Sequence, residues 1–176
     1  MNSPPKPRDP VALSASQLWR RLDPAVRALA AQALYEHDWG EAPARREADL
    51  IIARTMRFRD ATVRQLPIGK RAEYLATRVR PEDPLASSLL LALHLEHRRP
   101  LLTGFLDALH IPHENGAIVD DHDLRPPAPE SLAAAADKLF RDFPAEQVEV
   151  YLASLAALDF GTWGPLTAIL AKRGHG

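Results

Sequence analysis

The sequence has no cysteine, and this absence excludes several classes of protein at once. No disulfide can form, no thiolate can act as a nucleophile, and no metal site can use cysteine ligands. Because disulfides are typical of small secreted proteins, their absence predicts a cytoplasmic location. The excess of arginine over lysine, with abundant alanine and leucine, is typical of a GC-rich bacterial genome.

Long apolar runs and catalytic motifs are also missing. Even the run Leu89 to Leu93 falls far short of the roughly 20 residues that a membrane span needs, so we expect no membrane-spanning segment. The chain has no glycine-rich phosphate loop, G-x-S-x-G turn, H-E-x-x-H motif or calcium loop. Asp159-Phe160-Gly161 matches a kinase tripeptide without its companion loops, so we interpret it as coincidence and expect Gly161 to end a helix. These absences favour a non-enzymatic protein without a cofactor.

Helical periodicity runs through nearly every segment that is not rich in proline, whereas strand-like alternation is almost absent. The segment Leu85 to His97 is apolar on nearly all sides, which predicts a helix in the middle of the molecule. We therefore predict an all-α, irregular bundle of about eight helices, some of them paired as helical hairpins. Helices are expected to begin where a capping side chain occurs, followed in two cases by proline. These positions are Ser14 or Ser16, Asp23-Pro24, Asp60 and Asp83-Pro84.

Charge and proline divide the chain unevenly. Residues 1–12 contain four prolines and predict a mobile leader, followed by a single helical domain over residues 13–176. Residues 45–80 carry ten Lys and Arg against four Asp and Glu, whereas residues 81–176 carry seven against fourteen. An alternative division has two subdomains that meet near residues 80–84.

The basic region contains arginines at regular intervals. Arg57, Arg64, Arg71 and Arg78 are seven residues apart, and Arg54 lies nearby. On one continuous helix they would form a stripe for an acidic partner or for phosphates. Pro67 interrupts that helix, so we expect no continuous stripe and expect at least one arginine to pair with a carboxylate elsewhere in the fold. These five arginines are our candidate binding residues.

Histidines gather in one stretch of the chain. His94 and His97 share a helix face, and Asp107 precedes His110 and His113. Together these five residues could hold zinc, iron or manganese in a metal-dependent hydrolase or oxygenase. The intervening helix should, however, keep His94 and His97 too far from His113 for joint ligation, so we favour the absence of a metal site.

A long polar loop is expected near residues 110–129. Asn115-Gly116 between apolar residues predicts a miniature hairpin. The acidic cluster Asp120-Asp121-His122-Asp123 follows, in a segment that is either functional or a solvated tether.

The leading functional hypothesis is a non-enzymatic interaction or adaptor module that binds another protein. One alternative is a nucleic-acid-associated protein that uses the basic region, although the net charge of −1 argues against it. The other is the metal-dependent enzyme.

Overall fold

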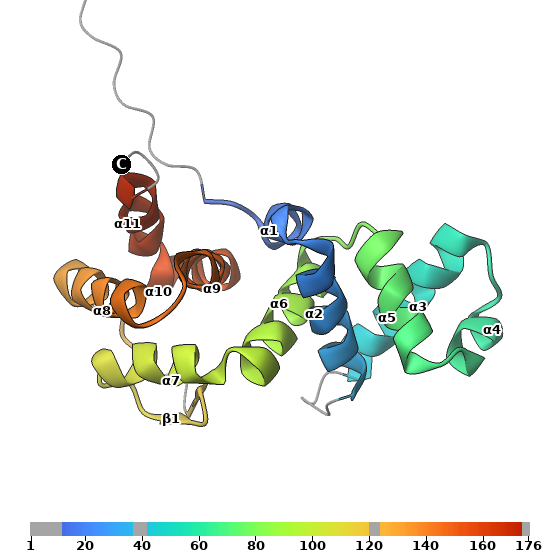
Figure 1. Cartoon of the computed structure of the whole chain (residues 1–176), viewed down its shortest axis with the longest axis horizontal. Helices are drawn as coiled ribbons and strands as arrows, with labels where there is room; N and C mark the ends of the chain where they lie inside the picture. Colours follow the sequence, from blue (N-terminus) through green and yellow to red (C-terminus); the bar gives the residue numbers. More distant parts are fainter. Residues whose placement is uncertain (1–11, 37–41, 120–123, 174–176) are drawn as a thin grey trace, which may run out of the picture.

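The structure is a computed structural model that describes residues 12–36, 42–119 and 124–173. Helices make up 76% of these residues, which confirms the predicted all-α bundle (Figure 1). The described residues form eleven helices where we expected about eight, because several are short; α10, for example, has four residues. The helices are α1 (Ala15–Arg21), α2 (Pro24–Glu36), α3 (Ala42–Met56), α4 (Asp60–Gln65), α5 (Ile68–Thr77), α6 (Asp83–His97), α7 (Arg99–Ala108), α8 (Pro129–Asp142), α9 (Ala145–Leu158), α10 (Phe160–Trp163) and α11 (Pro165–Arg173).

The predicted helix caps are correct at α1 but wrong at α4 and α6. Ser14 caps α1 in a capping box, in which its hydroxyl accepts from the Gln17 backbone and its own N–H donates to the Gln17 side chain. Two other predicted caps are wrong, because Asp60 and Asp83 are already the first residues of α4 and α6. Asp83 stabilises a different helix: its Oδ1 accepts a hydrogen bond of 2.8 Å from the Ser16 backbone N–H at the start of α1.

The buried side chains form two clusters that meet at α6. The first cluster is built by α1 to α6 and ends at Leu93, and the second begins at Leu95 and continues through α11. Leu85, Leu89 and Leu90 of α6 are fully buried, as expected for a central helix. Figure 1 shows α6 between one end of the molecule, which holds α3 to α5, and the opposite end, which holds α7 to α11. The two clusters therefore divide inside α6, between Leu93 and Leu95.

A two-stranded hairpin confirms the turn predicted at Asn115-Gly116. Strands β1 (His113–Glu114) and β2 (Ala117–Ile118) pair antiparallel, with His113 opposite Ile118. Asn115 and Gly116 have φ values of 51° and 90°, as a type I′ turn requires. Gly116 also packs closely on α7, because a Cβ added there would lie 3.0 Å from the Cβ of Leu102.

Three other expectations have mixed outcomes. Gly161 lies inside α10 and does not end a helix. The proline-rich leader, except for Ala12, and the acidic cluster at 120–123 lie outside the described residues. Among the described residues, none of the helices has the length and apolar character needed to cross a membrane.

Candidate functional site

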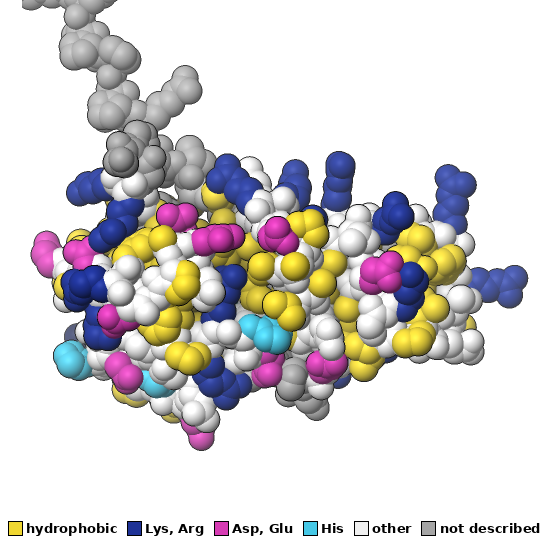
Figure 2. All heavy atoms as spheres, in the orientation of Figure 1, with side chains coloured by type: hydrophobic (Ala, Val, Ile, Leu, Met, Phe, Trp, Pro, Cys, Tyr) yellow, Lys and Arg dark blue, Asp and Glu magenta, His cyan; other side chains and the backbone are white. Residues whose placement is uncertain are grey.

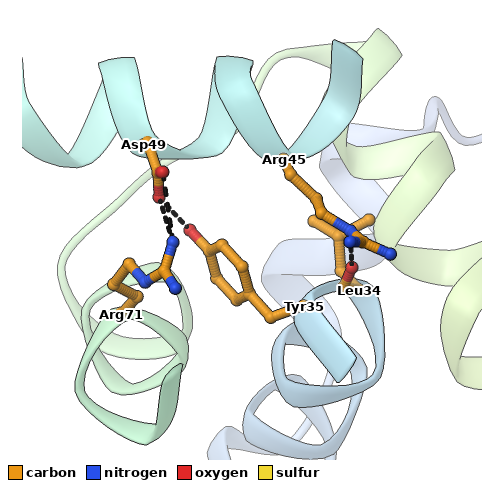
Figure 3. A network of polar contacts seen from close by, with 5 residues as sticks. All are labelled: Leu34, Tyr35, Arg45, Asp49 and Arg71. Atoms are coloured by element: carbon orange, nitrogen blue, oxygen red, sulfur yellow. Dashed lines mark hydrogen bonds and ion pairs between the residues drawn. The ribbon is translucent and has the colours of Figure 1, made fainter. Parts of the chain in front are cut away.

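A polar network fixes α3 against α2 and α5 (Figure 3). The Tyr35 hydroxyl donates a hydrogen bond of 2.8 Å to Oδ1 of Asp49, and Nη1 of Arg71 lies 3.2 Å from Oδ2 of the same carboxylate. The Arg71 guanidinium also stacks over the Tyr35 ring, 4.5 Å from its centroid. Burial and the neighbouring Asp49 carboxylate raise the pKa of Tyr35, so the hydroxyl stays a neutral donor. The orientation of α3 is therefore set by side chains from three helices.

A second contact joins α3 to the end of α2. Nε of Arg45 donates a hydrogen bond of 2.9 Å to the carbonyl oxygen of Leu34 (Figure 3). Leu34 is in the last turn of α2, where carbonyls have no partner within the helix. The negative end of the helix dipole also lies there. A guanidinium is therefore favoured at this position.

With this inner face fixed, α3 presents a basic outer face beside α4. Arg46, Leu50 and Arg54 follow one another at four-residue spacing and so share one side of the helix. A groove of about 360 Å³ separates this side from α4, and we call it the basic groove. Its lining residues are Arg45, Arg46, Asp49, Leu50, Asp60 and Arg64.

The five arginines identified in the sequence do not all lie on the surface. Arg54, Arg57, Arg64 and Arg78 are exposed, whereas Arg71 turns inward to Asp49. The expected pairing of at least one arginine with a distant carboxylate is thus confirmed. The break at Pro67 is confirmed too, because α4 ends at Gln65 and Pro67 is the N-cap of α5.

Arg45, Arg46 and Leu50 were missed by the sequence analysis. The seven-residue spacing that drew attention to other arginines crosses helix boundaries and has no structural meaning. The four-residue spacing of Arg46, Leu50 and Arg54 within one helix was the informative signal.

Positive charge at this end of the molecule is only partly compensated. Within the basic region, Asp49 pairs with Arg71, and Glu73 pairs with Lys70 at 2.8 Å. The exposed Arg46, Arg54 and Arg64 make no ion pair with any residue in the described ranges. The carboxylate surplus lies in the other half, where Lys138 pairs with Asp142 within α8 and Arg173 of α11 pairs with Asp137 of α8. Figure 2 shows Lys and Arg side chains projecting from the end of the molecule that holds α3 and α4.

The histidines do not gather at one point. Of the five candidate metal ligands, only His113 and Asp107 contact each other among the described residues. Nε2 of His113 lies 3.1 Å from Oδ1 of Asp107. The Gly116 N–H donates to Nδ1 of His113, so the ring hydrogen is on Nε2 and points to Asp107, which ties the hairpin to α7. His97 and His110 are exposed. In the part of the chain that the structure describes, no three His, Asp or Glu side chains are placed to hold a metal ion.

His94 is buried in the protein interior. Its Nε2 lies 3.1 Å from the hydroxyl of Ser154 on α9, and its ring packs edge-on against Tyr151. Burial, with a smaller effect of the nearby Arg98 charge, lowers the pKa of His94 to about 3. The imidazole is therefore neutral at physiological pH.

Comparisons with known proteins leave the fold and the groove as the basis for function. No family model, no curated protein and no solved structure matches this chain.

Proposed function

We propose that this chain is a non-enzymatic interaction module whose basic groove binds an acidic segment of a protein partner. The observation that carries the proposal is a pair of exposed arginines, because Arg46 and Arg64 stand on the two sides of the groove and make no ion pair with any described residue. Exposed arginines on both sides of a groove are well suited to bind carboxylates, because each guanidinium can donate two parallel hydrogen bonds to one carboxylate.

The groove also contains an apolar contact. Leu50 lies between the arginines and is half-buried, so it can pack against an apolar side chain of the partner. A phosphate backbone could not use this apolar contact, and three arginines against two aspartates in the lining make a weaker basic surface than nucleic-acid sites have. An amphipathic acidic helix therefore fits this surface better than a nucleic acid, which remains the second hypothesis.

A designed peptide tests this proposal. The probe is a fluorescently labelled amphipathic helix with glutamates flanking one row of leucines, titrated with the full chain at low and moderate salt. We expect saturable binding that weakens with salt. The double variant Arg46→Gln/Arg64→Gln should bind roughly tenfold more weakly, because each exposed ion pair contributes about 0.2–1 kcal/mol. Fluorescence anisotropy measures the affinity.

The matched control removes two arginines from the other half. Arg125 and Arg141 are exposed and lie outside the groove, so Arg125→Gln/Arg141→Gln should leave the affinity unchanged. An equal loss in both double variants would show that only the overall charge matters and would refute the groove. Duplex DNA or RNA that binds more tightly than the peptide, with a steeper salt dependence, would replace our proposal with the nucleic-acid hypothesis.

A further inference from the structure

A cavity of about 420 Å³ lies where α6, α7, α9 and α10 meet the hairpin. It is open to solvent, because Ala117, Leu158 and Asp159 in its lining are exposed, and its volume lies in the range of about 300–1,000 Å³ that is common for ligand pockets. Most of the lining is apolar and includes Leu91, Leu102, Leu106, Ile118 and Leu155. The cavity therefore has the size and the chemistry of a site for a small apolar molecule.

The polar groups in its wall have hydrogen-bonding roles that the structure defines. The Ser154 hydroxyl donates to the Val150 carbonyl at 2.7 Å, so its oxygen must accept from Nε2 of His94. Nδ1 of His94 is then an acceptor, and it is buried without a partner. His94 and Ser154 are only 3% and 0% exposed, which places them deep in the wall.

Tyr151 and Trp163 add donors without partners to the same wall. Tyr151 is 3% exposed and its ring packs edge-to-face on Phe105, 5.6 Å between centroids. Neither its hydroxyl nor the Trp163 indole N–H makes a hydrogen bond with a residue of the described ranges. A hydroxyl and an indole N–H without a protein partner can both donate to an acceptor of a ligand in the cavity.

The charges around the cavity select against anions. No Lys or Arg occurs among its described lining residues, and Asp159 is the one carboxylate. Hydrogen bonds from Thr162 hold the pKa of Asp159 below its usual value, so this group is negatively charged. An anionic ligand would lose its hydration without gaining a counter-charge from the described lining residues, which is costly.

We propose that this cavity binds a small, uncharged, mainly apolar molecule that carries a hydrogen-bond acceptor. A cavity of roughly 150 Å³ holds one benzene ring, so the present one accommodates a molecule with two rings. Tyr151 donates to the acceptor, and the leucines of α6 and α7 contact the rings. This site lies in the second buried cluster and does not depend on the basic groove.

Prodan, a neutral naphthalene ketone whose emission reports the polarity around it, is the probe for the full chain. We expect saturable, blue-shifted emission that the neutral acetylnaphthalene displaces and the anionic naphthoate does not. Tyr151→Phe should weaken binding roughly three- to tenfold, the contribution of one hydrogen bond. That substitution removes no hydrogen bond to a described residue, so the fold should be retained.

A blocking variant separates this cavity from other surfaces. Ala117 is an exposed lining residue on the hairpin, so Ala117→Trp should place an indole in the cavity and abolish the signal. Ala134→Trp, on the exposed side of α8, and Tyr74→Phe, in the first cluster, should bind like the unmodified chain. Absence of saturable binding, binding that survives Ala117→Trp, or equal displacement by naphthoate would each overturn the proposal.

Discussion

Individual polar residues in this protein have roles that depend on how deeply they are buried. Arg71 and Arg64 are seven residues apart, yet one neutralises Asp49 between three helices and the other is exposed beside the groove. His94 and His97 differ in the same way, because one is enclosed beside Ser154 and the other faces solvent. Residue type alone therefore did not distinguish structural from binding positions.

The buried imidazole should make stability depend on pH. The pKa of His94 is lowered from 6.5 to about 3 by burial, so below pH 6.5 the unfolded chain binds a proton that the folded chain does not. The stabilisation present above pH 6.5 is thus lost as the pH falls towards 3, by up to about 1.4 kcal/mol per pH unit. Between pH 7 and pH 5 this loss amounts to about 2 kcal/mol.

Urea unfolding at both pH values checks this expectation. His94→Gln should lack this part of the loss, and His110→Gln, which changes an exposed histidine, should retain it. If all three proteins lost the same stability between pH 7 and pH 5, His94 would not be the group responsible.

The separate elements follow local sequence signals closely. The hairpin is the clearest case, because Asn115 and Gly116 both need positive φ and their residue types permit it. The helix caps are less regular: Ser14 caps its own helix, but Asp83 contacts the start of α1, which is far away in the sequence. A capping side chain that accepts a hydrogen bond from the backbone of another helix cannot be predicted from residue spacing within its own helix.

A substitution in the hairpin turn tests this element. Gly116→Ala should lower the free energy of unfolding by about 1–3 kcal/mol, because alanine is strained at a φ of 90° and its Cβ would press on Leu102. Gly69→Ala, in α5 with no atom near the added methyl, should instead raise it by about 0.5–1 kcal/mol. Thermal unfolding distinguishes the two, and a neutral Gly116→Ala would show that the turn contributes little to stability.

The whole molecule combines two buried clusters with a separation of charge. The exposed arginines of α3 and α4 lie at one end, and the carboxylate surplus follows residue 80. α6 contributes leucines to both clusters and so links the two ends mechanically. We therefore expect the clusters to unfold together and not as independent units.

Two core substitutions test this linkage. Leu34→Ala in the first cluster and Leu132→Ala in the second should each cost about 2–5 kcal/mol. Each variant should show a single urea transition with a lower midpoint, and far-UV circular dichroism and tryptophan fluorescence should give the same midpoint. Fluorescence reports on both clusters, because Trp19 lies in the first and Trp163 in the second. Two separated transitions in either variant would contradict the linkage through α6.

The sequence by itself determined the all-α class, the central position of α6, the turn at Asn115-Gly116 and the helix break at Pro67. Each of these depends on residues within a few positions of one another, whose periodicity or backbone preference is a local property. Only the tertiary structure decided that Arg71 meets Asp49, that Arg46 and Arg64 border one groove, and that His94 and Tyr151 line one cavity. Those partners lie on different helices, and the packing of the helices, which no local pattern records, brings them together.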